Sequence, residues 1–208
     1  MGSVLVIGGG AAGLAAAIAA AECGDTVTVA EKMDRVGKKI LATGNGRCNL
    51  MNTGAPRYPG NAAFAAAVLS HCGAEKQKAF WEHLGLRLRQ EEAGRVYPVS
   101  SQASSVLDAL RLQLTALHVR VVTGVSITAL HRENDGWTAL SADGQRFRAN
   151  RVIISGGGCA QPKLGSDGSA LRLLTNLGCP ATTFAPALTQ IITDSTPIKG
   201  LSGIRVKS

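Results

Sequence analysis

The most constraining feature of the chain is a glycine-rich turn between a short apolar strand and an alanine-rich helix. Residues 4–18 read VLVIGGGAAGLAAAI, which places Gly8, Gly10 and Gly13 in the spacing G-x-G-x-x-G. Gly8 permits a tight turn, Gly10 leaves room for a pyrophosphate, and Gly13 lets the helix pack close to the sheet. The N-terminus of such a helix offers free N–H groups and a partial positive charge to a phosphate.

A second apolar strand over residues 26–30 ends at Glu31, eighteen residues after Gly13. An acid at this point accepts hydrogen bonds from a ribose diol and repels a 2′-phosphate, which favours the adenosine half of FAD or NAD over that of NADP. Gly24 stands where a helix C-cap glycine belongs. The alternative, a glycine turn without a ligand, is disfavoured by this strand, helix and acid.

The composition indicates a globular chain with a basic balance. The 208 residues are 45% hydrophobic and 17% charged, enough for one sizeable core or one domain and part of another. Part of the formal charge of +8 follows the glycine motif directly, at Lys32, Arg35, Lys38, Lys39 and Arg47. This segment is either a solvated basic face or one that attracts an anionic cofactor. Without a basic stripe interleaved with aromatic residues, we expect no nucleic-acid partner.

The sequence carries no targeting or metal-binding pattern. Residues 4–21 are uncharged, but they contain four glycines and lack a basic flank, so we expect neither a membrane span nor a signal peptide, and a cytoplasmic location. The cysteines lack a Cys-x-x-Cys pair, which disfavours a disulfide framework and a zinc site. They are Cys23, Cys48, Cys72, Cys159 and Cys179.

The rest of the chain predicts a helical insertion followed by β-structure. Helical patterns cover 37–44, 62–84 (two helices, with Phe64, Val68 and Leu69 on the apolar side of the first) and 104–117. Strand signals cover 119–122, 125–130, 137–140, 151–155, 190–193 and 204–206. Asp143-Gly144 indicates a hairpin turn, and a leucine-rich helix begins near Ser169.

This order is βαβ, a helical insertion, a β-meander, a parallel strand and a helix. It is typical of a two-dinucleotide-binding-type (glutathione-reductase-like) FAD domain, whereas a plain NAD domain would continue βαβαβ directly after Glu31. We therefore expect an α/β fold with a parallel sheet.

Three further motifs resemble a known family. They are GKKILATGNGRCNL at 37–50, GRVYP at 94–98, and GGG at 156–158 followed by GSDG at 165–168. Over essentially all 208 residues the chain resembles the BaiN/RdsA (YhiN-like) flavoproteins, also called aminoacetone-oxidase-family FAD-binding enzymes. The resemblance implies the N-terminal part of an FAD-dependent oxidoreductase with two-electron flavin chemistry, NAD(P)H as a candidate electron donor, and a small-molecule substrate that the sequence does not name. Family members continue beyond residue 208, so the resemblance implies a C-terminally incomplete fold that keeps the adenosine and pyrophosphate half of the site. The FAD-binding domain would cover 1–186, and an inserted substrate domain would begin over 187–208.

The resemblance also implies which residues contact the cofactor, without assigning a catalytic residue or a metal site. The pyrophosphate would face Gly8, Gly10, Ala12 and Gly13, the ribose Glu31, and the adenine the backbone of Ile127. The basic segment and the following loop would run beside the pyrophosphate and the flavin through Lys32, Lys38, Lys39, Gly44, Asn45, Gly46, Arg47, Cys48 and Asn49. The cofactor would be closed over by Ser155, Gly156 and Gly157.

Several assignments keep a second interpretation. Arg47 either neutralises cofactor charge or forms a surface salt bridge, and Cys48 is either a structural thiol or a nucleophile. Tyr97 either stacks on a ring or fills the core, and Asp167 is either a helix cap or a base. The functional alternatives are a non-catalytic dinucleotide-binding fragment, an RNA-modifying flavoenzyme suggested by the +8 charge, and a plain NAD dehydrogenase, which the 44–49 loop disfavours.

Overall fold

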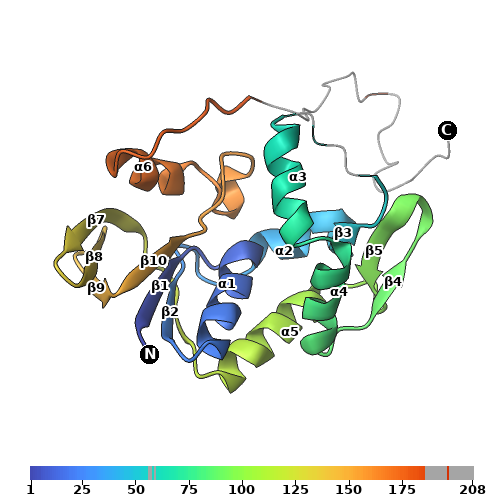
Figure 1. Ribbon diagram of the computed structural model, residues 1–208, viewed down its shortest axis with the longest axis horizontal. Helices are drawn as coiled ribbons and strands as arrows, with labels where there is room; N and C mark the ends of the chain where they lie inside the picture. Colours follow the sequence, from blue (N-terminus) through green and yellow to red (C-terminus); the bar gives the residue numbers. More distant parts are fainter. Residues whose placement is uncertain (56–57, 59, 186–195, 197–208) are drawn as a thin grey trace.

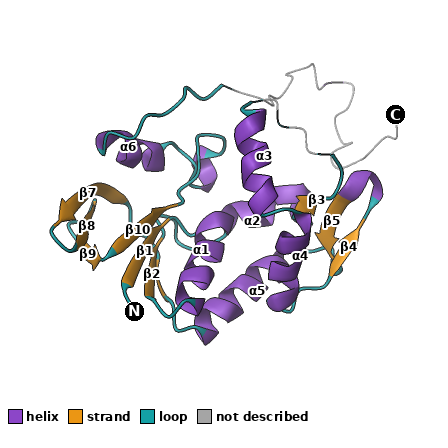
Figure 2. Ribbon diagram, viewed as in Figure 1, coloured by secondary structure: helices purple, strands orange, loops and turns teal. Residues whose placement is uncertain are grey.

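The computed structural model describes residues 1–55, 58, 60–185 and 196. Its centre is a parallel sheet with the strand order β10-β1-β2-β6 (Figures 1 and 2). The predicted α/β fold with a parallel sheet is confirmed. The strands are β1 (Ser3–Ile7), β2 (Thr26–Ala30), β6 (Arg120–Val122) and β10 (Arg151–Ile154).

Two helices cover one face of this sheet. Helix α1 (Ala11–Glu22) connects β1 to β2, and α5 (Ala103–Ala116) packs beside it (Figure 1). Leu14 and Ile18 of α1 join Leu110 of α5 in one core cluster, all with fully buried side chains. Helix α1 is apolar nearly throughout and α5 has an apolar face, so both helices bury side chains against this face of the sheet.

A β-meander and a short helix cover the other face. The meander consists of β7 (Ile127–Glu133), β8 (Gly136–Ser141) and β9 (Arg146–Ala149), and the helix is α6 (Ser169–Asn176). Leu173 of α6 joins Leu5, Ile7 and Ile127 in a second core cluster. The predicted hairpin turn at Asp143-Gly144 connects β8 to β9, as expected.

The strand pattern at 119–122 has a different partner from its neighbours in sequence. It forms β6, which pairs in parallel with β2 through Val29 and Val121 and does not join the meander. This three-residue strand follows α5 in the chain and lies at one edge of the sheet, next to β2. Strand β10 is half-buried, although its sequence suggests a fully buried strand.

The insertion between β2 and α5 contains helices and a small antiparallel sheet of order β3-β5-β4. The two helices expected within 62–84 are confirmed, but Phe64 and Val68 on the first are 68% and 48% exposed, so this apolar side does not enter the core. The helices are α2 (Lys38–Ala42), α3 (Ala62–His71) and α4 (Ala74–His83), and the strands are β3 (Met51–Asn52), β4 (Leu88–Gln90) and β5 (Arg95–Pro98).

The strands expected at 190–193 and 204–206 lie outside the described residues, as does nearly all of 187–208. The domain boundary after residue 186 therefore stays a prediction. Within the described part of the chain, every helix is too short or too polar to cross a membrane.

Candidate functional site

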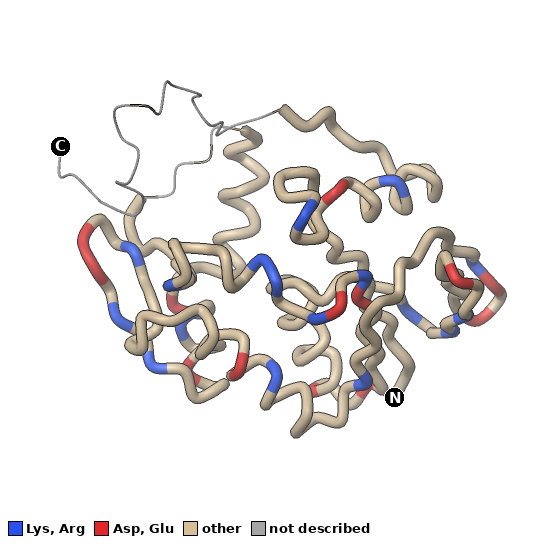
Figure 3. Tube along the Cα trace, turned by 180° about the vertical axis from the view of Figure 1, so that it is seen from behind, with Lys and Arg blue, Asp and Glu red and all other residues tan. Residues whose placement is uncertain are grey.

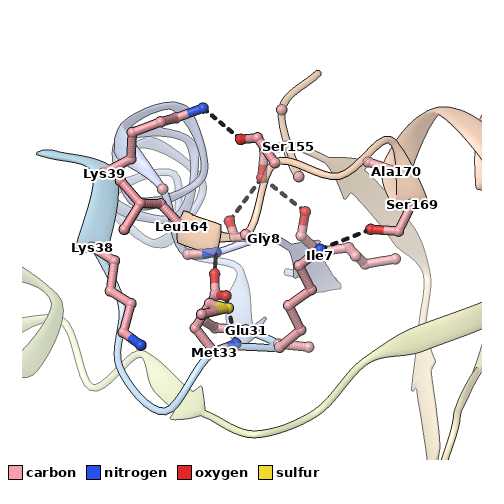
Figure 4. A pocket seen from close by; sticks show the side chains of 18 of the residues that line it. Ile7, Gly8, Glu31, Met33, Lys38, Lys39, Ser155, Leu164, Ser169 and Ala170 are labelled. Atoms are coloured by element: carbon pink, nitrogen blue, oxygen red, sulfur yellow. Dashed lines mark hydrogen bonds between the residues drawn. The ribbon is translucent and has the colours of Figure 1, made fainter. Parts of the chain in front are cut away.

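A cavity of about 250 Å³ opens at the carboxyl ends of β1 and β2, beside the N-terminus of α1. Figure 4 shows side chains from several segments around it. Segments far apart in sequence form its walls: the glycine turn, the β2–α2 connection, residues 125–127, residues 155–157 and residues 164–173. In a parallel α/β sheet this edge is where ligands bind.

The glycines of the turn meet different requirements. Gly8 has a φ of +107°, and a Cβ there would lie 2.7 Å from Gly156 Cα. A Cβ on Gly13 would lie 1.9 Å from the Gly8 carbonyl oxygen, so helix and strand pack directly against each other. Gly10 has a φ of −83°, and a Cβ there would meet no atom within 4 Å. The chain itself therefore does not require glycine at position 10, which lines the cavity.

Glu31 lies buried at the end of β2 and lines the same cavity. Its Oε2 accepts a hydrogen bond of 2.6 Å from the Gly9 N–H, and its Oε1 accepts one of 2.8 Å from the Met33 N–H. Figure 4 shows the carboxylate between the glycine turn and Met33. Each carboxylate oxygen holds one main-chain donor and keeps a second acceptor site, so the ribose contact is sterically open to test and stays a prediction.

Two of the predicted lysines connect the β2–α2 segment to the loop before α6. Lys32 Nζ lies 2.6 Å from Asp167 Oδ1 and 3.1 Å from Ser169 Oγ, while Lys39 Nζ donates to Ser166 Oγ. The Lys32 ammonium, with the Ser169 hydroxyl, holds the pKa of the Asp167 carboxyl well below its usual range.

Asp167 Oδ1 also accepts a hydrogen bond from the Ser169 N–H at the start of α6. The N-cap of α6 is Gly168, without a side-chain capping bond, so Asp167 lies one residue before the cap and is not the helix cap itself. Lys38 also lines the cavity, where its ammonium pairs with Asp34 four residues earlier.

Five more of the predicted residues also lie at the cavity. Ala12, Ile127, Ser155, Gly156 and Gly157 line it. Ser155 Oγ donates to the carbonyl oxygens of residues 7 and 8 at 3.0 and 2.9 Å, which fixes β10 against the glycine turn.

The 44–49 loop is not among the lining residues. Arg47 pairs with Glu91, and its guanidinium lies 4.0 Å from the centre of the Tyr97 ring. The Arg47 hydrogen bond lowers the pKa of Glu91 and raises that of Arg47 itself. Arg47 thus adopts the salt-bridge alternative in this structure. The buried Tyr97 belongs to β5, in agreement with the core alternative.

Cys48 is buried with a φ of +57°, and burial raises the pKa of its thiol. These observations agree with the structural-thiol interpretation. The cofactor contacts of the loop stay predictions for Gly44, Asn45, Gly46, Arg47, Cys48 and Asn49.

Some lining residues were not identified from the sequence, because they are apolar or small residues without a motif of their own. Ser166 lies inside the GSDG motif and could have been found there. The others include Met33, Val125, Ser126, Leu164, Ala170 and Leu173.

A family model described as the HI0933-like protein Rossmann domain matches residues 2–204. The 3-dehydro-bile acid Δ(4,6)-reductase of Clostridium scindens is 43% identical over 99% of this chain and 51% of its own length. The ribosomal RNA dihydrouridine synthase of Haemophilus influenzae is 24% identical over 85% of this chain and 45% of its own length. The chain thus spans about half the length of these curated relatives.

Two solved structures share the fold at low identity. Thermovibrio ammonificans THI4 superposes with a TM-score of 0.52 at 14% identity, covering 82% of this chain and 62% of its own. The 3-ketosteroid-Δ4-(5α)-dehydrogenase of Rhodococcus jostii RHA1 gives a TM-score of 0.54 at 19% identity, covering 76% of this chain and 46% of its own. At these identities the similarity establishes the fold alone.

Proposed function

Because the chain belongs to the HI0933-like family, we propose that it is the FAD-binding part of a flavoprotein oxidoreductase. The observation that carries this proposal is Gly10. Neither its backbone angles nor its neighbours require glycine, and it faces the cavity at the N-terminus of α1. A pyrophosphate that approaches the backbone there supplies the missing requirement.

The residues around the cavity fit such a group. Main-chain N–H groups at the start of α1 would bind the pyrophosphate, and Lys39 contributes positive charge nearby. The backbone at Ile127 would face the adenine, and Glu31 lies where a ribose is expected. The bound group supplies two-electron transfer, and the chain supplies binding and orientation.

The proposed reaction is the reduction of a small molecule, with NAD(P)H as the electron donor. The 43% identity to a reductase named for the Δ(4,6) bonds of a 3-dehydro-bile acid supports this class. A cyclic unsaturated ketone is therefore the first substrate to test. The chain has about half of that relative's length, so turnover is to be tested in the longest available form of the protein.

The test is a visible absorption spectrum of the purified chain after incubation with FAD and desalting. We expect flavin bands in the protein fraction and their bleaching by NADH or NADPH without oxygen. Retained flavin that neither nucleotide bleaches would support the non-catalytic alternative. A folded chain that stays colourless would overturn FAD binding by these 208 residues.

A second candidate, action on RNA, is favoured by the relatives named ribosomal RNA dihydrouridine synthase and by the charge of +8. Against it, Figure 3 shows Lys and Arg spread over several segments and interspersed with Asp and Glu. We therefore keep the expectation of no nucleic-acid partner. Retention of ribosomal RNA at low salt, lost steeply as salt is raised, would reverse it.

A further inference from the structure

Glu31 lies at the start of the β2–α2 connection, one wall of the cavity, and joins it to two others. Its side chain holds the glycine turn through the Gly9 N–H and the β2–α2 connection through the Met33 N–H. Its main chain holds the third wall, because the Glu31 N–H donates to the Val122 oxygen at 2.8 Å and the Val125 N–H donates to the Glu31 oxygen at 2.9 Å. All three segments contribute lining residues.

The peptide groups on both sides of Gly9 are fixed by these contacts. The Gly9 N–H, in the peptide after Gly8, donates to Glu31. The Gly9 carbonyl, in the peptide before Gly10, accepts a hydrogen bond of 2.8 Å from the Gly37 N–H. These two peptides lead directly into α1, so their orientation sets the direction in which the first N–H groups of the helix point.

We infer that Glu31 is a positioning residue, which arranges the glycine turn and its neighbouring walls before any nucleotide binds. A carboxylate suits this task because it only accepts hydrogen bonds, and both of its partners are main-chain donors. This role is separate from the expected ribose contact. Its nucleotide-binding consequence rests on the proposed function, whereas its structural consequence does not.

The positioning role and the ribose contact predict different effects of one substitution, Glu31→Gln. A ribose diol both donates and accepts, so an amide can replace the carboxylate there. A main-chain N–H cannot accept a hydrogen bond. The amide NH2 group of glutamine would therefore face one of the two main-chain N–H groups, and that N–H would be buried without an acceptor. One lost partner of this kind is expected to cost about tenfold in an equilibrium constant.

The binding test compares ADP with 2′-deoxy-ADP, for wild type, Glu31→Gln and the matched surface control Glu22→Gln. We expect Glu31→Gln to weaken both nucleotides by about the same factor, roughly tenfold, and the control to change neither. Unchanged binding of both nucleotides by Glu31→Gln, which is the result expected if the carboxylate only contacts the ribose, would overturn the inference, and so would a loss confined to ADP.

Hydrogen exchange in the nucleotide-free protein tests the structural consequence directly. We expect the Gly9 and Met33 amides to be protected like strand amides in wild type, and to exchange at least about tenfold faster in Glu31→Gln with other amides unchanged. Fast exchange of both amides in wild type overturns the inference, even if the variant does not fold. If wild type binds neither nucleotide and also retains no FAD, the proposed function fails, and exchange alone decides the role of Glu31.

Discussion

Gly10→Val is expected to remove nucleotide binding while leaving the fold intact. Gly10 precedes α1 with a φ of −83° and a ψ of −173°, an extended conformation that valine adopts readily. The new Cβ would meet no protein atom within 4 Å. Replacing glycine at an N-cap costs up to about 1 kcal/mol, and the stiffer unfolded chain returns about 0.4–1 kcal/mol, so the free energy of unfolding should change by less than about 1 kcal/mol.

The effect on binding should be much larger. The valine side chain would fill the space between the first N–H groups of α1 and a pyrophosphate. A hydrogen bond to a charged group contributes about 1.5–3 kcal/mol, so losing two of them costs about 3–6 kcal/mol. Since every 1.4 kcal/mol is a factor of ten, the dissociation constant for FAD should rise by at least about 100-fold.

The assay pairs an FAD titration with urea unfolding, and Gly13→Ala is the matched control. A Cβ at position 13 would lie 1.9 Å from the Gly8 carbonyl oxygen, so that variant should lose about 1–3 kcal/mol of stability or more. Two results would refute the reasoning: Gly10→Val with wild-type FAD affinity, or a loss of more than about 2 kcal/mol of stability in that variant.

Two further predictions concern side chains at and beside the site. Asp167→Asn should remove a pH-dependent part of the stability. The Lys32 hydrogen bond lowers the pKa of Asp167 in the folded state, so its contribution is present above about pH 4 and is lost as the pH falls. The carboxyl is partly exposed, which limits the effect to about 1 kcal/mol, measured by comparing urea unfolding of wild type and variant at about pH 6 and about pH 3. Cys48 should resist a thiol reagent in the native state, whereas the four exposed cysteines should react. A fifth reactive thiol should appear on unfolding. Five reactive thiols in the folded protein would contradict the buried environment of Cys48.

The first βαβ unit could be predicted from the sequence because its signals are local. The glycine spacing fixes the turn after β1, and Gly24, with a φ of +88°, ends α1 as expected. The amphipathic pattern of α5 predicts its ends to within a residue, since Leu107, Leu110 and Leu114 recur on one buried face. In each case the deciding interactions join residues a few positions apart.

The features that the sequence left open depend on partners that are distant in the chain. Strand β6 has only three residues, and its place is decided by pairing with β2, about ninety residues earlier. Arg47 is basic and lies in a glycine-rich loop, which suits a phosphate equally well. Its partner Glu91 is 44 residues away, so only the folded structure reveals the pair. The same holds for Glu31 and Gly9, which are 22 residues apart.

The glycine turn separates what the fold requires from what a ligand requires. Gly8 and Gly13 cannot carry a side chain because of neighbouring main-chain atoms, and a Cβ on Gly9 would lie 2.6 Å from Val36 Cγ1. Gly10 alone among these four glycines has both an ordinary φ and free space around its missing Cβ. The fold therefore favours glycine at position 10 only weakly, through the N-cap preference. A group that approaches the backbone at the start of α1, as proposed above, would add the stronger requirement.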